Sequence, residues 1–303
     1  MRALRRHGFT LVELLIVLVV GGTVAAAATR LLQRQQRFYT SAGSLVMQRA
    51  SLRDATGIIP GDIRALSAVD GDIIAFSDSS IEMRATIGSA IACDTVAGGA
   101  ALHLAPDQVS DATPSVFASF ATMPDGGDIA LVYDSGTDDA SDDQWVSATI
   151  DRVSSGTDLC AASPFAPIVR PGSASVRLDL VAGDRLPPTV RPGAFVRVVR
   201  RVRYRFYRAS TAEWFLGYST WNGTTLGAVQ PVSGPYAPYR PDSRSGFALR
   251  FFDGAGGRVT SEMDPRSIVR IEISARGDAR AGLSGGGAAP PDSQTVTIRL
   301  RNR

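Results

Sequence analysis

The chain has 303 residues, of which 44% are hydrophobic, and this is enough for a folded core in one large domain or two small ones. Its formal net charge is only +3, and it contains no lysine, so every basic side chain is an arginine. Because Asp and Glu nearly balance the arginines, the composition gives no reason to expect nucleic-acid binding, and the absence of lysine excludes a phosphate-binding loop of the lysine type.

A basic segment followed by an apolar one opens the chain. Residues 1–8 read MRALRRHG, and in the 20-residue run from Phe9 to Ala28 only Thr10, Glu13 and Thr23 are clearly polar. As a helix this run is about 30 Å long, the thickness of the hydrocarbon core of a bilayer. The arginines of residues 1–8 should stay in the cytoplasm, so we expect the chain after residue 28 to face outward.

Three kinds of segment fit this opening: a signal peptide cleaved near Ala28, a plain single-span anchor and a prepilin leader. Glu13 favours the third. A carboxylate at the centre of a bilayer costs on the order of 2.5–3.5 kcal/mol, and neither a signal peptide nor a plain anchor has a use for one.

The motif Gly8-Phe9-Thr10-Leu11-Val12-Glu13, followed by unbroken hydrophobicity, resembles the N-terminal signal of type IV prepilins and type II secretion pseudopilins. The resemblance implies that prepilin peptidase cuts after Gly8 and N-methylates Phe9. It also implies that Glu13, the fifth residue of the mature chain, pairs with the Phe9 amine of a neighbouring subunit. Opposite charges attract strongly in a medium of low dielectric, so such a pair would set the register of assembly.

The helical pattern continues beyond this apolar run. Apolar side chains recur every seven residues, at Leu31, Phe38, Leu45 and Leu52. Gly57 and the Pro60-Gly61 pair are stop signals. We therefore predict one helix over residues 9–56, transmembrane over 9–28 and then amphipathic, with the outer half of its apolar stripe packed on the following domain.

After residue 60 the hydrophobic pattern alternates with a period of two. It predicts strands over Ile73–Phe76, Ser80–Arg84, Ile129–Tyr133, Trp145–Val153, Val176–Leu180, Val196–Phe206, Trp214–Trp221, Phe247–Phe252, Ile268–Ser274 and Thr295–Leu300. Asn222-Gly223 predicts a hairpin turn, and Gly282–Pro291 predicts a flexible loop. Strands without intervening helices favour an antiparallel sheet. The predicted class is α+β, with a long N-terminal helix and a large β-rich head over residues 57–303.

The clearest strand, Val196–Phe206, places apolar side chains on one face and most of its arginines on the other. We interpret the arginine face as an exposed sheet face or a charged sheet edge. A nucleic-acid partner is not expected, because nucleic-acid modules usually add aromatic side chains to such a face. Within this strand, Val202–Phe206 resembles a late strand of PilW-type minor pilins and of J-type pseudopilins.

Two features of the head carry candidate sites. Cys93 and Cys160 predict one disulfide, since the chain is expected to be exported, and the alternative is two unpaired thiols in a core. An acidic run offers hard oxygen ligands for calcium, although its spacing is not that of an EF-hand and a solvated acidic loop is the alternative reading. The candidate ligands are Asp134, Asp138, Asp139, Asp142 and Asp143.

No catalytic constellation is present in the sequence, since His103 is the only histidine after the leader, and we predict no enzyme activity and no cofactor. The leading hypothesis is a minor pilin or pseudopilin, a structural subunit that primes or caps a type IV pilus or a type II secretion pseudopilus. Its expected partners are prepilin peptidase and, through the N-terminal helix, other pilin-like subunits. Its expected location is the inner membrane, head in the periplasm, and then the filament. The alternative is a non-enzymatic binding module, either periplasmic or at a filament tip as an adhesin or DNA-binding subunit.

Overall fold

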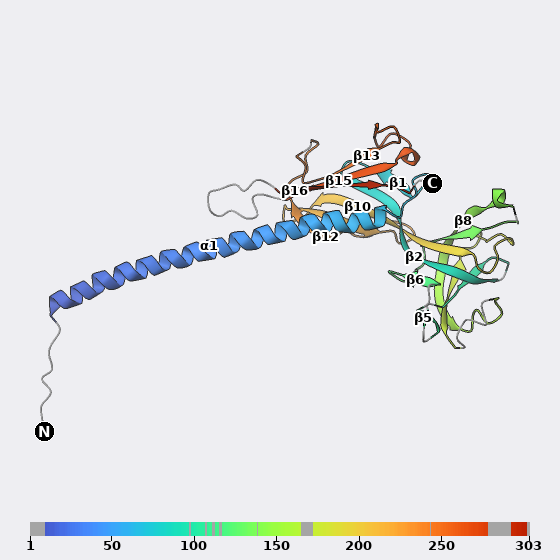
Figure 1. Ribbon diagram of the computed structural model, residues 1–303, viewed down its shortest axis with the longest axis horizontal. Coiled ribbons are helices and arrows are strands. Elements are labelled where there is room, and N and C mark those ends of the chain that lie inside the picture. The colour runs from blue at the N-terminus through green and yellow to red at the C-terminus, as the bar shows by residue number, and fades with distance from the viewer. Residues whose placement is uncertain are drawn as a thin grey trace, which may run out of the picture.

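The computed structural model describes residues 10–96, 98–106, 108–110, 113–114, 117–137, 139–164, 172–242, 244–277 and 292–301. A single long helix, α1 (Leu11–Ile63), projects from a β-rich head (Figure 1). Its 53 residues correspond to a length of about 80 Å. Helix accounts for 22% and strand for 42% of the residues, which confirms the predicted α+β class.

The head consists of antiparallel strands and two short 3-10 turns, η1 (Ala140–Asp142) and η3 (Pro265–Ser267). The strands are β1 (Ile73–Phe76), β2 (Ser80–Val96), β3 (Ala101–Leu104), β4 (Gln108–Ser110), β5 (Thr113–Pro114), β6 (Ala118–Phe120), β7 (Ile129–Asp134), β8 (Gln144–Thr157), β9 (Ala174–Leu180), β10 (Phe195–Arg208), β11 (Trp214–Thr220), β12 (Gln230–Tyr236), β13 (Phe247–Phe252), β14 (Arg258–Val259), β15 (Arg270–Arg276) and β16 (Ser293–Arg299).

One lobe of the head, here called the sandwich, packs two sheets against the end of α1. The first sheet runs in the order β1-β2-β10-β11-β12 and the second in the order β14-β13-β15-β16. Aromatic side chains join the two sheets, because the ring centroids of Phe76 and Phe251 lie 4.5 Å apart and those of Phe206 and Phe247 lie 5.8 Å apart. The helix contacts β12, β15 and β16, so it closes one side of the sandwich.

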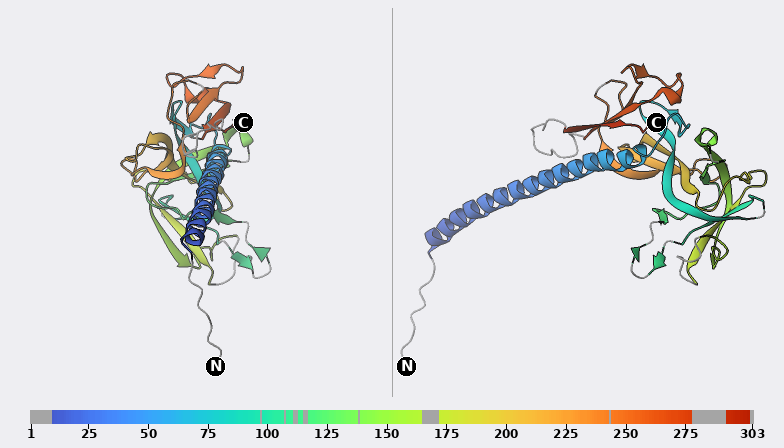
Figure 2. Two further views of the ribbon diagram at one scale, coloured as in Figure 1. Left: turned by 90° about the vertical axis from the view of Figure 1, so that its left-hand side faces the viewer. Right: turned by 45° about the vertical axis from the view of Figure 1, so that its right-hand side comes forward.

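The other lobe, here called the barrel, is formed by residues 87–199. Its strands pair in a closed ring, β2-β3-β9-β8-β7-β10, because β10 pairs with both β7 and β2. Closure leaves no free sheet edge within the ring. Figures 1 and 2 show this lobe beyond the end of α1, beside the sandwich.

Two long strands, β2 and β10, run through both lobes. Their register shifts between Val198 and Val199, where Ile87 of β2 is left without a partner as a bulge. The buried clusters divide at the same place, since Ala85 and Val202 belong to the core of the sandwich whereas Ile87 and Val198 belong to the core of the barrel. A bulge bends and twists a strand pair, which explains how one pair of strands serves two cores.

The helix ends at Ile63 rather than near residue 56, which corrects the predicted boundary. Pro60 lies inside it and costs about 3 kcal/mol in a helix interior. The last turns bury Ile59 and Ile63 completely, and such side chains contribute about 1.5–3 kcal/mol each. Burial of these two side chains therefore offsets the proline.

Each strand that the sequence predicts is present, but β2 is much longer than predicted and some strands were missed. Among them is β12, whose segment contains Pro231 and Pro235 and lies at a sheet edge, where proline is tolerated. The turn at Asn222-Gly223 begins the β11–β12 connection, which continues to Gln230 and is longer than a two-residue hairpin. The predicted loop Gly282–Pro291 lies outside the described residues.

Candidate functional site

The candidate site is the exposed part of α1, and it begins with a capping box. Thr10 is the N-cap, and its Oγ1 accepts a hydrogen bond from the backbone N–H of Glu13 at 3.2 Å. In return, the Glu13 carboxylate accepts hydrogen bonds from the backbone N–H of Thr10 at 3.0 Å and from its hydroxyl at 3.1 Å. The box satisfies donors that the first helical turn leaves unpaired, and it places a negative charge at the positive end of the helix dipole.

The capping box is a functional feature that the sequence reasoning missed. Its signal was readable, because Thr-x-x-Glu before an apolar run is the sequence signature of a helix start. Glu13 thus has a partner within its own chain, Thr10, and it remains exposed at the N-terminal end of α1. Gly8 and Phe9, the predicted cleavage and methylation positions, lie outside the described residues.

The apolar segment that follows contacts no other part of the described chain. By length and composition α1 is able to cross a membrane, and none of its most apolar window is buried in the head. Thr23, the polar residue nearest its middle, donates its hydroxyl to the carbonyl of Val20 at 2.8 Å, so that group is satisfied within the helix. This arrangement suits a lipid-facing or subunit-facing helix.

The middle of α1 is also exposed, which corrects part of the predicted stripe. Leu52 is buried in the head, but Leu45, expected to pack there with it, is exposed. Leu31 and Phe38 are exposed as well. The helix therefore presents apolar side chains well beyond the membrane-length segment, and contiguous apolar surface of this kind marks an interaction site.

The joint between α1 and the head is hydrogen-bonded as well as packed. The hydroxyl of Tyr236 donates to the carbonyl of Ser51 at 2.7 Å, and Ser51 Oγ donates to the carbonyl of Gly234 at 2.8 Å. Near the end of the helix, the hydroxyl of Tyr204 donates to Asp62 at 2.8 Å. Burial raises the pKa of Tyr236 to about 12, and burial likewise raises the pKa of Asp62 above its ordinary value.

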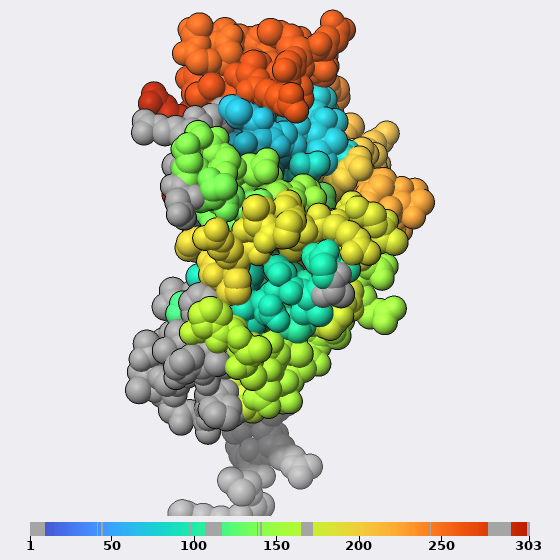
Figure 3. Space-filling view, turned by 90° about the vertical axis from the view of Figure 1, so that its right-hand side faces the viewer, coloured from blue at the N-terminus to red at the C-terminus, as the bar shows by residue number. Residues whose placement is uncertain are grey.

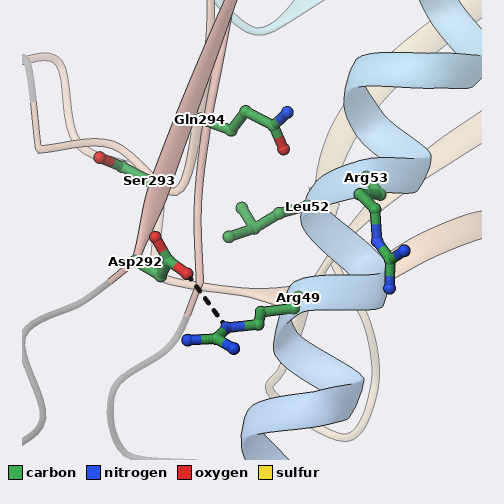
Figure 4. A pocket seen from close by; sticks show the side chains of 6 residues that line it. All are labelled: Arg49, Leu52, Arg53, Asp292, Ser293 and Gln294. Carbon is green, nitrogen blue, oxygen red and sulfur yellow. Dashed lines mark ion pairs between the residues drawn. The ribbon is translucent and has the colours of Figure 1, made fainter.

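An open groove of about 350 Å³ lies at this joint, between α1 and β16 (Figure 4). Arg49 on the helix and Asp292 before β16 form an ion pair across it at 3.6 Å. Both side chains are more than half exposed, so the pair contributes little to stability. Leu52 lies at the floor of the groove and anchors the helix to the core.

Residues 4–29 match the family model described as the prokaryotic N-terminal methylation motif. The chain has a type IV prepilin-like N-terminus. The match supports a structural role of the pilin or pseudopilin type, processing by prepilin peptidase and assembly with other pilins. It is also consistent with membrane anchoring through the apolar helix. No curated protein and no solved structure matches the chain.

Four arginines of β10 in this prepilin-like chain are paired with carboxylates, and their strand is central rather than an edge. Arg205, on the same strand, is exposed. This corrects the alternative of a charged edge, because β10 pairs with β2, β7 and β11. The arginine face stays partly exposed, since the side chains of Arg201 and Arg203 are 33% and 38% exposed. The carboxylate partners are Asp72 for Arg197 at 3.0 Å, Asp128 for Arg200 at 2.6 Å, and Glu82 for Arg201 and Arg203. Asp72, Asp128 and Glu82 are buried and therefore require such partners, so these four arginines serve the fold.

We expect Glu82 to make the head sensitive to acid. Although burial raises its pKa, hydrogen bonds from Arg203 and Arg201 outweigh that effect, and the net pKa of Glu82 is lowered from 4.5. A lowered pKa contributes stability that is present above pH 4.5 and is lost as the pH falls through the folded-state value. We expect Glu82→Gln to reduce the unfolding free energy by about 1–3 kcal/mol at pH 7.

The difference between wild type and Glu82→Gln should shrink as the pH falls below 4.5, because the wild-type carboxylate then becomes protonated. Urea unfolding of both proteins between pH 3 and pH 7 measures this. A difference that stays constant across the range would show that the charge of Glu82 does not stabilise the head.

The acidic run is held by hydrogen bonds from its own surroundings. The donors are Gly136 and Thr189 for Asp134, Thr137 for Asp142, Ser141 for Asp139 and Tyr133 for Asp143. Asp138 lies outside the described residues. Among the residues that the structure describes, no group of three or more His, Cys, Asp or Glu side chains is arranged to hold a metal ion. The described part of the run is therefore a structured acidic loop.

A disulfide joins Cys93 of β2 to Cys160, which follows β8, with their Cα atoms 5.5 Å apart. Both cysteines are buried. The bond therefore ties β2 to the turn that follows β8 in the barrel. His103, on β3, donates its Nδ1–H to the carbonyl of Leu159 at 3.1 Å, and its buried Nε2 has no hydrogen-bond partner within the described part of the chain.

Proposed function

We propose that this chain is a minor pilin or pseudopilin. In this proposal prepilin peptidase cuts after Gly8 and methylates Phe9, residues 9–28 hold the protein in the inner membrane, and residues 57–303 form a periplasmic head. The subunit then enters the filament of a type IV pilus or a type II secretion pseudopilus. The observation that carries the proposal is a capped helix that starts at the prepilin motif and leaves its whole apolar length uncovered.

The exposed helix is the proposed contact with other subunits. Its apolar side chains, including Leu31, Phe38 and Leu45, have no cover from the described head. Burying each of them against a neighbouring helix contributes about 1.5–3 kcal/mol. Glu13 sets the register of this contact, because its carboxylate is able to exchange its hydrogen bonds with Thr10 for an ion pair with the Phe9 amine of a neighbour.

The size of the head supports a role in priming or capping. The barrel is a second lobe of residues 87–199, built on the extensions of β2 and β10, the two strands that it shares with the sandwich. This lobe lies beyond the end of α1 and enlarges the head. Subunits inside a filament are stacked on neighbours on all sides, and a small head suits that stacking better than a large one. The end of a filament has fewer neighbours, so a bulky subunit fits there best.

The proposal predicts the first residue of the mature protein. We expect the protein extracted from membranes to begin with N-methyl-Phe9, because the basic leader, Gly8 and the spacing to Glu13 fit prepilin peptidase. Intact-mass analysis measures this. The same preparation from a strain without prepilin peptidase should retain residues 1–8. A mature protein that starts near residue 29 would refute the proposal and indicate an ordinary signal peptide.

A further inference from the structure

The two lobes of the molecule carry opposite charge. Residues 87–199, the barrel, contain fourteen aspartates and six arginines, a net charge of −8. The remaining residues, which comprise the leader, α1 and the sandwich, contain 26 arginines and 15 acidic residues, a net charge of +11, or +8 without the three arginines of the leader. The total of +3 conceals this separation. Summed fields of this kind steer association and decide which surfaces meet.

The barrel also exposes an aromatic row on its outer face. Val132 of β7 pairs with Val196 of β10, and both are buried in the barrel core. The next residues, Tyr133 and Phe195, therefore lie on the opposite, outer face. Tyr133 pairs with Trp145 of β8, with ring centroids 5.3 Å apart. Phe195 is 61% exposed and Trp145 is 49% exposed, which is unusual for such large apolar side chains.

One carboxylate, Asp143, adjoins this row, and a second, Asp151, lies on the same face about 20 Å from Trp145 along β8. Asp143, two residues before Trp145, accepts the hydroxyl proton of Tyr133 in a hydrogen bond of 2.6 Å. Asp151 lies on the same outer face of β8 as Trp145, three alternate positions further along, and it is exposed. Aromatic faces beside carboxylates bind guanidinium groups well, because arginine both stacks on rings and pairs with carboxylates.

The same chain carries a surface of the complementary kind. Between residues 14 and 53, α1 has no acidic residue and five arginines, at Arg30, Arg34, Arg37, Arg49 and Arg53. Exposed Phe38 and Tyr39 lie among them. Figure 1 shows this part of the helix on the side of the sandwich away from the barrel, and Figure 3 shows the face of the head that is turned away from the helix. One copy therefore cannot bring its own two surfaces together.

We infer that the aromatic–acidic face of the barrel, formed by Phe195, Tyr133, Trp145, Asp143 and Asp151, docks on the arginine-rich part of α1 of a second copy. The contact is heterologous, because two different surfaces meet, and it leaves one free surface of each kind at the ends of every complex. Copies therefore join head to tail in short rows. This inference rests on the proposed function, in which α1 contacts other subunits, and it names the partner of the barrel.

Sedimentation velocity of the mature full-length chain in detergent micelles tests the inference. We expect association that increases with protein concentration and that weakens between about 0.01 M and about 1 M salt, where the Debye length falls from about 30 Å to about 3 Å. The double variant Phe195→Ala/Trp145→Ala should associate at least about tenfold more weakly, since exposed aromatic anchors dominate such interfaces. Val69→Ala, which trims an exposed apolar side chain outside the barrel, should associate like wild type.

A mixing experiment tests the head-to-tail geometry. The variant Arg30→Asp/Arg34→Asp loses the helix surface, and Phe195→Ala/Trp145→Ala loses the barrel surface. At a protein concentration where the about tenfold weaker association leaves each variant alone monomeric, a mixture of the two should form dimers and nothing larger, because only one productive contact remains.

Either of two results would overturn the inference: a wild-type chain that is monomeric at low salt, or association that the double variant Phe195→Ala/Trp145→Ala leaves unchanged. The second result would assign self-association to the apolar helix alone. Mass analysis of the same samples keeps the proposed function separate, because a monomeric chain that begins with N-methyl-Phe9 would refute the docking but not the pilin role. Circular dichroism of each variant establishes that the head is folded.

Discussion

Replacing Glu13 with alanine should remove most of the chain from sheared filaments while its amount in the membrane stays near that of wild type. The carboxylate stands within an otherwise apolar segment, and without it the Phe9 amine of a neighbour is left unpaired in a medium of low dielectric, which typically costs about 3–5 kcal/mol. Insertion should persist, because losing a charge makes the span more apolar. Quantitative immunoblots of membrane and filament fractions measure both amounts.

A matched variant separates the two roles that the structure gives to Glu13. Glutamine keeps the reciprocal hydrogen bonds of the capping box with Thr10 but carries no charge. If assembly depends on the charge, Glu13→Gln should be depleted from filaments as strongly as Glu13→Ala. Wild-type filament content for Glu13→Gln would assign the residue to capping, and wild-type content for both variants would show that it is no assembly contact.

Local signals in the sequence were enough to predict the parts of the chain that depend on neighbours in sequence. The apolar run, the leader and the position of Glu13 predicted the prepilin-like N-terminus, and an alternation that only Arg200 interrupts on its apolar side predicted β10. The end of α1 was predicted too early because Pro60 is a strong local stop signal. Burial of Ile59 and Ile63 in the sandwich, which no local signal reports, overrides it.

Non-local pairing explains the rest of what the sequence did not reveal. The ring of the barrel closes because β10 meets β2 and β7, which precede it by more than 60 residues. The arginines of β10 looked like a free basic face because their partners, Asp72, Glu82 and Asp128, belong to distant segments. The exposed aromatic row was equally hidden, since Trp145 and Phe195 become neighbours only through Tyr133.

Breaking the disulfide should destabilise the barrel more than the sandwich. Cys93 and Cys160 are separated by 67 residues, and in the chain-entropy model a bond that closes a loop of this length contributes about 4 kcal/mol. The bond and its loop lie within the barrel, and the bulge at Ile87 separates its core from that of the sandwich. The double variant Cys93→Ala/Cys160→Ala keeps small apolar side chains at two buried positions, so it tests the covalent bond rather than the volume.

Hydrogen exchange of the two proteins reports each lobe separately. In the double variant we expect amides of β8 to lose protection by a factor of about 100 or more, as a loss of about 3 kcal/mol implies, while amides of β13 stay close to wild type. Equal loss in both strands would show that β2 and β10 couple the lobes into one cooperative unit. Two titratable thiols in the unreduced wild-type protein would refute the bond itself. Loss of protection in β8 alone would show that the barrel opens independently of the sandwich. The disulfide would then stabilise the barrel in the periplasm, a compartment where disulfides persist.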